Sequence, residues 1–427
     1  MRVYKPSSIK WLGEIPQSWE IKPLQAIFNQ RNEQNNNLEF QTILSLVKDV
    51  GVIPYEEKGN VGNKAKDDLQ GYKIARVNDL VLNKMNAVIG SLGVSKYDGL
   101  VSPIYLVLYI ENLNYLIAYY SYLFQTKSIQ KFLRKFAYGI MEIRESIDYL
   151  EFKKMFLPTP PLQEQKEIAE FLDSKCEKIQ NYIDKKQKLI TLLQEKKQAL
   201  INEAVTKGLN PNIESKNSGI EYLGLIPHHW EIKKLKYVGK VVLGKMLCNE
   251  HQKGYSHCYY LKSKNLQWLN VEVSQIEKMW FSEYEKSLYR IKKDDLLVSE
   301  GGEVGKTCIW NNELAECYIQ NSVHKITLNK FNNAKFFLYL FFTYGKLGVF
   351  DSVVSRVSIA HLVLEKLVNV DMVVPPLQEQ KQIANFLDEK CEKINSAIEK
   401  TKRQIELIKE YKNTLINEAV CGRIRVN

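Results

Sequence analysis

The sequence contains no apolar stretch long enough to cross a membrane. Its most apolar run, Phe336–Phe342, is far shorter than the roughly 20 residues that a membrane-spanning helix needs. The first residues, Met1–Tyr4, do not resemble a secretory signal, and the seven cysteines include no Cys-x-x-Cys pair. Because secretory signals and disulfide frameworks mark oxidising compartments, these absences predict a soluble protein of the reducing cytoplasm.

Motifs of catalysis are also missing. The segments Asn210–Asn212 and Pro160–Leu162 both fail to complete an Asn/Asp-Pro-Pro-aromatic motif, and no Gly-x-Ser-x-Gly elbow occurs. Residues Gly301–Thr307 are similar to a phosphate-binding loop, but Glu300 stands where that motif requires glycine. We therefore expect no catalysis by this chain, with a nuclease site of scattered carboxylates and lysines as the alternative.

A metal site is not predicted either. Cys248, His251, His257 and Cys258 are the group of residues that could most readily suggest a zinc site. Their spacing fits no common structural zinc motif, and the adjacent pair His257-Cys258 makes poor ligand geometry.

The sequence has an excess of positive charge. It contains 60 Lys and Arg against 49 Asp and Glu, which gives a formal net charge of +11 and a pI near 9.0. Such a charge favours a polyanionic partner, although lysines on solvated helix faces give the same balance. Basic and aromatic residues mix at 131–136 and 289–293, a pattern that suits contact with phosphates and bases but also arises from core rings.

Two long segments of the chain are nearly the same. Residues 160–205 and 375–420, aligned without a gap, are identical at 29 of 46 positions. The pattern Leu-Gly-x-Ile-Pro-x-x-Trp at Leu12–Trp19 recurs at Leu223–Trp230. Because the regions between the repeats are dissimilar, the chain consists of two units of about 212 residues with a shared frame and different inserts. This organisation suits a protein that recognises two different things at a fixed separation.

Each repeat predicts one long helix. After Pro161 and Pro376 no proline or glycine occurs until Gly208 and Gly422, and these are the usual start and stop signals. A helix of about 45 residues is roughly 65 Å long. Apolar residues recur in it at the spacings of a coiled-coil seam. The predicted seam consists of Ile168, Leu172, Cys176, Ile179, Ile183, Ile190 and Leu193, continuing to Leu200 and Ala204, and of Ile383, Leu387, Cys391, Ile394, Ile398, Ile405 and Ile408, continuing to Leu415 and Ala419.

The two helices are expected to pair with each other. A helix rich in Lys and Glu can bury only one stripe, and a pseudo-twofold relation between the repeats makes the pair antiparallel. Two independent helices, each packed on its own domain, are the alternative. The predicted fold class is therefore α+β, with two mixed α/β domains separated by a pair of long antiparallel helices. We place the first domain with its entry segment at 1–158, the first helix at 159–208, the second domain with the repeated entry segment at 209–374, and the second helix with a C-terminal tail at 375–427.

The two inserts share one local pattern. Asn78–Leu82 matches Asp294–Val298, and in each case a polar turn leads into a buried strand and then a Gly-rich loop. Such loops bring backbone close to a ligand, or are only tight turns. Candidate nucleic-acid contacts come from these loops and from the basic-aromatic clusters. They are Lys84, Asn86, Lys96, Arg134 and Lys135 in the first domain, and Lys262, Lys264, Glu303, Lys306 and Arg356 in the second.

One known family has the same motifs. The segment Pro-Pro-Leu-Gln-Glu-Gln-Lys-x-Ile-Ala-x-Phe-Leu-Asp, at Pro160–Asp173 and Pro375–Asp388, resembles the signature of the DNA-specificity (S) subunit of Type I restriction-modification enzymes. The opening Leu12–Trp19 and its repeat are similar to that family, as is Leu-Ile-Asn-Glu-Ala-Val at both helix ends. The segments 101–105 and 320–323 resemble strand motifs of its target-recognition domains. The match is doubled and covers the whole chain in the right order.

The resemblance implies a function. Each variable domain would be a target-recognition domain that reads one half of a split site in double-stranded DNA, with the helices as the ruler. The partners would be two methyltransferase (M) subunits and the restriction and translocation (R) subunits. S-adenosylmethionine, ATP and Mg would belong to those subunits, and this chain would hold no cofactor. The expected function is therefore a non-enzymatic specificity subunit and scaffold; a coiled-coil scaffold that binds no DNA and a standalone DNA-modifying enzyme are the alternatives.

Overall fold

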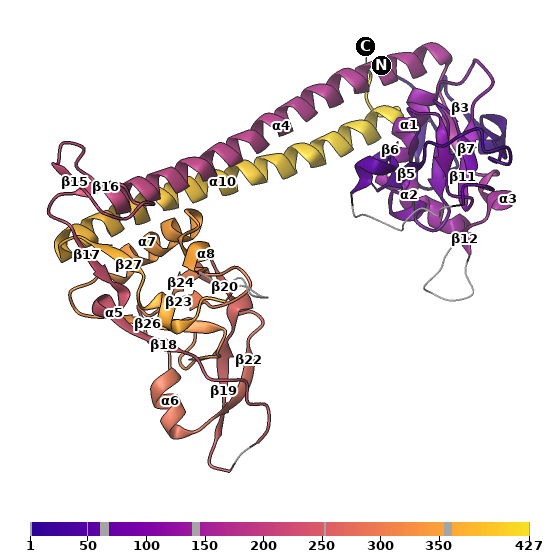
Figure 1. Ribbon diagram of the computed structural model, residues 1–427. Coiled ribbons are helices and arrows are strands. Elements are labelled where there is room, and N and C mark those ends of the chain that lie inside the picture. The colour runs from indigo at the N-terminus through magenta and orange to yellow at the C-terminus, as the bar shows by residue number, and fades with distance from the viewer. Residues whose placement is uncertain are drawn as a thin grey trace. The chain divides into compact units, whose positions relative to one another are not determined.

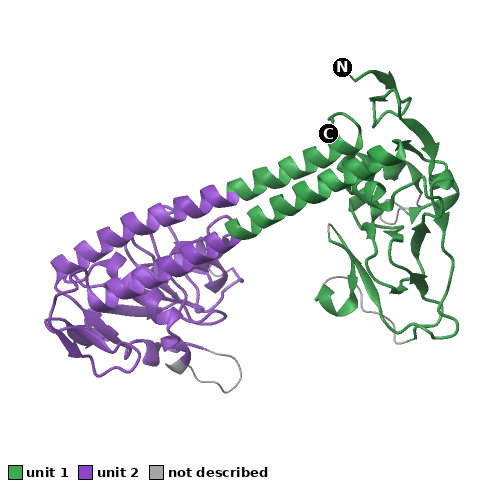
Figure 2. Cartoon of the chain, turned by 90° about the horizontal axis from the view of Figure 1, so that it is seen from above, with its two compact units in different colours: residues 1–186, 403–427 green, residues 187–402 purple. Residues whose placement is uncertain are grey.

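The computed structural model describes residues 2–48, 50–59, 68–138, 146–251, 253–353 and 361–426. The chain forms two compact units, which Figure 2 colours separately: unit 1 is residues 1–186 with 403–427, and unit 2 is residues 187–402. Each unit combines one mixed domain with part of both long helices. The sequence-based boundaries treat each long helix as a separate segment, whereas the contacts in the structure divide each helix between the two units.

The two long helices are continuous (Figure 1). Helix α4 (Leu162–Lys207) has 46 residues and α10 (Leu377–Val420) has 44. Each begins directly after the Pro-Pro pair and ends just before a glycine. Gly208 and Gly422 have φ of +77° and +72°, the left-handed conformation with which helices commonly terminate and which glycine adopts without strain.

Within each unit the two helices run antiparallel. In unit 1, Ile168 and Leu172 near the start of α4 share a core with Ile416 and Val420 near the end of α10. In unit 2 the ends are exchanged, because residues 201–205 of α4 pack with residues 383–391 of α10. A helix start packed against a helix end, in both units, confirms the predicted antiparallel pair and the α+β fold class.

The predicted seam residues are all shielded from solvent to some degree. Eleven are buried: Ile168, Leu172, Ile179, Ile190, Ala204, Ile383, Leu387, Cys391, Ile398, Ile405 and Ala419. Five are half-buried: Cys176, Ile183, Leu193, Ile394 and Ile408. Near the end of each helix the deepest residues are Ile201 and Ile416, one position beyond the predicted Leu200 and Leu415. The shift arises because the last turns pack on a domain core as well as on the other helix.

The central sheets of the two units have the same strand order. Unit 1 has β4 (Asn29–Gln30), β11 (Tyr105–Tyr109), β8 (Leu80–Asn83) and β9 (Leu92–Val94). Unit 2 has β18 (Gly239–Leu243), β26 (Val323–Leu328), β23 (Leu296–Ser299) and β24 (Thr307–Ile309). All neighbouring pairs are antiparallel. The internal repeat therefore extends into the inserts, although their sequences are dissimilar.

Helices cover one face of each sheet and join it to the long helices. In unit 1 these are α1 (Ile117–Gln125) and α2 (Lys127–Leu133); in unit 2 they are α7 (Ala334–Lys346) and α8 (Val349–Val353). Leu80 and Leu82 of β8 share one core with Tyr119 of α1, and Leu296 and Val298 of β23 share one with Phe336 of α7. Alternate apolar residues of a strand line one face of a sheet, which is why these positions recur at a spacing of two.

The entry segments form matching small sheets. In unit 1, β1 (Tyr4–Pro6) pairs with β2 (Glu14–Pro16), and β3 (Glu20–Pro23) with β14 (Phe156–Thr159). In unit 2, β15 (Ser215–Asn217) pairs with β16 (Leu225–Pro227), and β17 (Glu231–Lys234) with β27 (Asp371–Val374). Strands β14 and β27 lead directly into the long helices, so each helix start is fixed to the sheet that precedes it.

The remaining elements distinguish the two units. Unit 1 adds β5 (Leu44–Val47), β6 (Gly51–Pro54), β7 (Lys73–Ala75), β10 (Gly99–Val101), β12 (Ala137–Tyr138), β13 (Ser146–Ile147), α3 (Tyr149–Phe152) and four short 3-10 turns, η1 (Leu24–Ala26), η2 (Tyr55–Lys58), η3 (Ala87–Ile89) and η4 (Arg134–Phe136). Unit 2 adds α5 (Leu235–Val238), β19 (Ser256–Leu261), η5 (Ser263–Asn265), β20 (Leu266–Gln267), β21 (Asn270–Val271), β22 (Glu277–Phe281), α6 (Glu283–Tyr289), β25 (Tyr318–Ile319) and α9 (Leu364–Leu367). Different loops and hairpins therefore surround two sheets that have the same strand order.

Candidate nucleic-acid interface

A buried glutamine fixes the start of each long helix to its domain. Gln165 Oε1 accepts from the backbone N of Leu116 at 2.8 Å, and its Nε2 donates to Asn114 O at 3.1 Å and to Pro160 O at 2.8 Å. Gln380 repeats the arrangement, since its Oε1 accepts from Asn333 N and its Nε2 donates to Pro375 O, both at 2.8 Å. Both glutamines are fully buried. The second glutamine of the Pro-Pro-Leu-Gln-Glu-Gln motif is thus a structural anchor.

In each long helix, an aspartate eight residues after this glutamine makes a second connection to the domain. Tyr122 of α1 donates to Asp173 Oδ1 at 2.6 Å, and Tyr339 of α7 donates to Asp388 Oδ1 at 2.9 Å. Burial and the hydrogen bond to the carboxylate raise the pKa of each tyrosine well above its usual value. The phenols therefore stay protonated and keep donating, which holds α1 and α7 on the long helices.

The entry tryptophans are held differently in the two units. Trp19 Nε1 donates to Glu164 Oε2 at 2.8 Å, and Arg2 also pairs with Glu164. In unit 2 the corresponding Glu379 lies 2.7 Å from His229 Nε2, and the buried Trp230 Nε1 has no partner among the described residues. Both indoles fill the core, so the repeat preserves packing while its polar contacts change.

The candidate residues of unit 1 lie in three places. Lys84 and Asn86 follow β8, and Lys84 is half-buried whereas Asn86 is exposed. Arg134 and Lys135 are exposed on η4, with Lys135 Nζ 4.8 Å from the centre of the Phe132 ring. Lys96 is exposed after β9. Because Val94 pairs with Leu80 at the beginning of β8, Lys96 lies at the opposite end of that strand from Lys84.

Strand β13 brings two of these places together. Ile147 N donates to Lys84 O at 3.0 Å, and the next residue, Asp148, donates through its N to Phe136 O at 2.9 Å. The loop of Lys84 and Asn86 is therefore adjacent to the 3-10 turn that carries Arg134 and Lys135. These four residues form the stronger candidate surface of unit 1, and Lys96 stands apart from it.

The candidate residues of unit 2 are mostly paired with acids. Lys262 Nζ lies 2.6 Å from both carboxylate oxygens of Glu277, and Lys264 Nζ lies 3.0 Å from Oε1. These two lysines, with the hydroxyl of Tyr260, lower the pKa of Glu277 to about 2. Two positive charges thus share one negative charge, which leaves a single net charge for contact with phosphate.

Glu303 and Lys306 form a second paired group. Lys306 Nζ lies 2.8 Å from Glu303 Oε2, and Trp268 Nε1 also donates to Glu303. The loop that leads to this group begins near η5, because Ser263 N donates to Ser322 Oγ and Glu300 N donates to Ser322 O. Sequence reasoning missed Trp268 and Glu277, which have no motif of their own. Arg356 lies outside the described residues.

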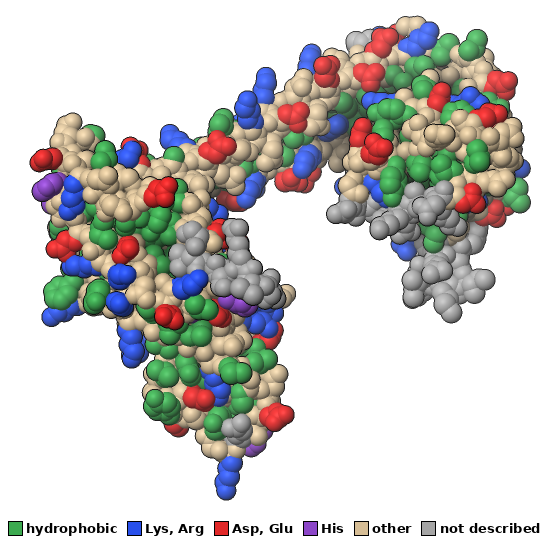
Figure 3. All heavy atoms as spheres, viewed as in Figure 1, with side chains coloured by type: hydrophobic (Ala, Val, Ile, Leu, Met, Phe, Trp, Pro, Cys, Tyr) green, Lys and Arg blue, Asp and Glu red, His purple; other side chains and the backbone are tan. Residues whose placement is uncertain are grey.

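Charge is distributed rather than gathered on the face that Figure 3 shows. Lys and Arg side chains lie among Asp and Glu side chains along the long helices and over unit 2. The face in view therefore carries no broad basic surface, and the candidate contacts on it are short loops with a few charges each.

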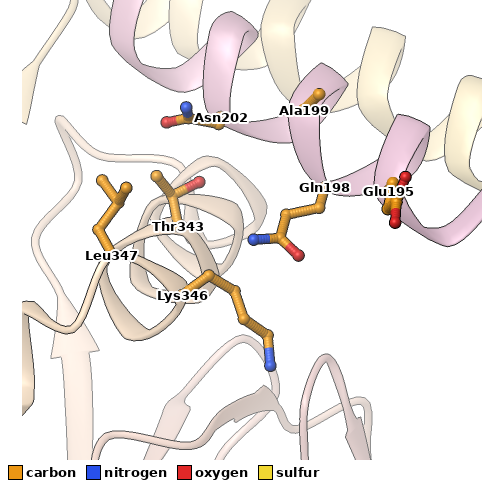
Figure 4. Close-up of a pocket in the computed structure, with 7 residues that line it drawn as sticks. All are labelled: Glu195, Gln198, Ala199, Asn202, Thr343, Lys346 and Leu347. Carbon is orange, nitrogen blue, oxygen red and sulfur yellow. The ribbon is translucent and has the colours of Figure 1, made fainter.

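A small cavity lies between α4 and α7 in unit 2 (Figure 4). It has a volume of about 290 Å³ and is lined by Glu195, Gln198, Ala199, Asn202, Thr343, Lys346 and Leu347. The buried hydroxyl of Thr343 has no partner in the part of the chain that is described.

Neither a metal-binding cluster nor a membrane-spanning helix is found among the described residues. His251 and His257 pack on the ring of Trp280, with ring centres 4.6 and 4.7 Å apart. Among the described residues, no group of three or more His, Cys, Asp or Glu side chains could hold a metal ion. No helix within the described ranges is both long and apolar enough to span a membrane.

Solved structures are similar to this fold over nearly its whole length. A chain from work on complex assembly and conformational transition of the type I R-M system covers 96% of this chain and 99% of its own length, with a TM-score of 0.70 and 15% identity. The HsdS subunit from Thermoanaerobacter tengcongensis covers 96% and 98%, with a TM-score of 0.54 and 15% identity. At these identities the likeness concerns the fold.

Sequence comparisons identify the family. A putative type I restriction enzyme MjaX specificity subunit from Methanocaldococcus jannaschii is 26% identical over 447 aligned residues, covering 100% of this chain and 99% of the relative. The EcoBI specificity subunit from Escherichia coli is 29% identical over 136 residues, which are 32% of this chain and 28% of the relative. Residues 16–193 and 227–407 each match the family described as the Type I restriction modification DNA specificity domain. With two such domains spanning most of its length, this chain belongs to the family of Type I restriction-modification specificity subunits, which are non-catalytic.

Proposed function

We propose that this chain reads a split sequence in double-stranded DNA, one half with each unit, and holds the M and R subunits of a Type I restriction-modification system. The observation that carries the proposal is one strand order with two different sets of loops. A shared frame keeps the loops in equivalent positions, and different loop side chains give each unit its own target. Lysines and arginines contact phosphates, and loop side chains contact base edges.

The long helices are proposed as the docking site for the M subunits. Besides the buried seam they expose several large apolar side chains, which are 39–56% accessible: Tyr182, Leu189, Leu192, Leu407 and Tyr411. Exposed apolar residues along a helix are typical of surfaces that a partner covers. S-adenosylmethionine, ATP and Mg are proposed to bind in the M and R subunits, and the complex to work in the cytoplasm.

The experiment is selection from a randomised duplex library by the purified full chain, followed by sequencing of the bound DNA. We expect two short enriched sequences at a constant separation, with an affinity that falls steeply as salt rises because phosphate contacts release counterions. A parallel incubation with labelled S-adenosylmethionine should transfer no methyl group to DNA unless an M subunit is added. Binding without any sequence preference would instead favour a scaffold, and methylation by the lone chain would favour a standalone enzyme.

A further inference from the structure

Lys84 and Glu300 occupy the same position in the two units. Each follows the last residue of an equivalent strand: Asn83 of β8 lies opposite Tyr105 of β11, and Ser299 of β23 lies opposite Val323 of β26. Each backbone carbonyl accepts one hydrogen bond from a returning segment, from Ile147 N at 3.0 Å in unit 1 and from Leu362 N at 2.8 Å in unit 2.

The turn before each strand supports the same equivalence. Asn78 and Asp294 both have a left-handed φ, of 71° and 69°. The buried aspartate that follows accepts from the backbone N of the residue three positions earlier, at 2.8 Å in both units. The offset in numbering is 216 residues at the turn, the strand and the residue after the strand. The two side chains therefore start from matching backbone sites.

The side chains at these sites have opposite charges. Both are half-buried, and neither forms a side-chain hydrogen bond or an ion pair with a described residue. In this they differ from Lys262, Lys306 and Glu303, whose charges are paired. A partly desolvated charge without a partner costs free energy, and a ligand group of complementary charge or polarity would offset that cost.

The groups that surround the two side chains also differ. In unit 1, burial lowers the pKa of Lys73, whose Nζ donates to Tyr105 O at 2.7 Å, and the positive charge of Lys84 lowers this pKa further. In unit 2, burial raises the pKa of Glu300, which His361 partly opposes. Unit 1 therefore presents the Lys84 ammonium at this site, whereas unit 2 presents the Glu300 carboxyl group.

We propose that Lys84 and Glu300 are equivalent specificity residues, of which Lys84 reads guanine in one half-site and Glu300 reads cytosine in the other, an inference that rests on the proposed function. In the major groove guanine offers two acceptors, O6 and N7, which suit the Lys84 ammonium. Cytosine offers the N4 amino donor, which suits the Glu300 carboxylate. Adenine also has an amino group, but its adjacent N7 acceptor repels a carboxylate. The two half-sites therefore differ at this position, with guanine facing unit 1 and cytosine facing unit 2.

The test is selection from a randomised duplex library with the full chain and four variants, Lys84→Gln, Lys84→Arg, Glu300→Gln and Glu300→Lys. Lys84→Gln should lower the preference for guanine at one position of one half-site about 10-fold, and Lys84→Arg should retain it. Glu300→Gln should move one position of the other half-site from cytosine toward adenine, because an amide matches adenine N6 and N7. Glu300→Lys should move it toward guanine.

The chain provides matched controls in Lys10 and Glu221. They occupy equivalent positions of the two entry segments and have the same opposite charges, but both are exposed. Lys10→Gln and Glu221→Gln should leave every base preference unchanged. Thermal melting of each variant shows whether it is folded, and the charge-retaining Lys84→Arg supports the assignment even where Lys84→Gln unfolds.

Each outcome decides a different point. If the unsubstituted chain selects a split sequence and folded Lys84 and Glu300 variants keep all its preferences, this inference is wrong and the proposed function stands. If the unsubstituted chain selects no sequence at all, the proposed function fails and the inference with it.

Discussion

At the scale of single residues, the repeated motif is better explained by structure than by contact with DNA. Gln165 and Gln380 each satisfy backbone groups of the segment that precedes a domain helix, and Asp173 and Asp388 each hold a tyrosine of that helix. These four polar residues fix the domain to the long helix. The glutamines have to match the backbone groups they bind and the aspartates the tyrosine hydroxyls, which explains why all four are the same in both units.

Replacing Gln165 with alanine should therefore destabilise unit 1. The change leaves the N–H of Leu116 and the carbonyls of Asn114 and Pro160 without their partner, at a cost of about 3 kcal/mol. Gln163→Ala is the control, because Gln163 is exposed on the same turn and should change the free energy of unfolding by less than about 0.5 kcal/mol. Urea unfolding of the full chain measures both, and equal midpoints would contradict the anchoring role.

The sequence predicts these residues only in part. Repetition identifies the motif, but two of the three partner groups of Gln165 are backbone atoms about 50 residues earlier in the chain, and no local pattern encodes such a contact. The same limit applies to the candidate interface. Lysine and glycine patterns select Lys262 and Lys264, whereas Glu277, which pairs with both, becomes adjacent to them only through the hairpin of β19 and β22.

At the scale of elements, helix boundaries follow local rules and the sheets do not. Proline before and glycine after each long helix place its ends within a few residues, because both act through backbone geometry alone. The four-stranded sheets pair residues as far apart as Gly239 and Leu328, and only the short match of Asn78–Leu82 with Asp294–Val298 indicates that the two sheets share an order. Local sequence signals therefore predict the long helices well, whereas the strand order of the sheets could be determined only from the structure.

The glycine that ends α10 gives a prediction for this element. A Cβ at Gly422 would lie 2.7 Å from Pro16 Cδ and 2.9 Å from the Trp19 ring. Gly422→Ala should therefore cost about 1 kcal/mol for its left-handed φ and roughly 1–3 kcal/mol more for the contacts. Gly13→Ala is the control, since Gly13 has φ of +74° and a Cβ added there would meet no atom within 4 Å. A thermal melt in which both variants lose the same stability would show that the entry segment does not pack on the helix end.

At the scale of the whole molecule, the shared helices predict a fixed distance between half-sites. Inserting one heptad after Gln187 and one after Lys402 lengthens the pair by ~10 Å, or about 3 bp of DNA. The two half-site sequences should stay the same while the spacer between them grows, as read by sequencing of selected duplexes. A single insertion, in one helix only, should instead disrupt the pairing of the seam. An unchanged spacer in the double insertion would show that the helices do not set the distance.

The division of each helix between the units gives the last prediction, which concerns a fragment of residues 1–212. That fragment lacks 403–427, and with it Ile416, Ala419 and Val420, which complete the core of unit 1. Its own α4 carries the same residues at Ile201, Ala204 and Val205, within the shared sequence Leu-Ile-Asn-Glu-Ala-Val. A second copy can therefore supply them, and two fragments should form a twofold dimer.

Such a dimer should bind an inverted repeat of one half-site, because a twofold protein reads a palindrome. Analytical ultracentrifugation at tens of micromolar measures the association, and duplex selection measures the target. Replacing Ile179 and Ile183 with Asp places carboxylates in the seam and should abolish the dimer at a cost of several kcal/mol. The exposed positions Gln180 and Asp184 on the same turns provide the control, because Gln180→Asp and Asp184→Asn leave the seam intact. A folded fragment that stays monomeric, or a dimer that still selects two different half-sites, would show that the two units are not interchangeable modules.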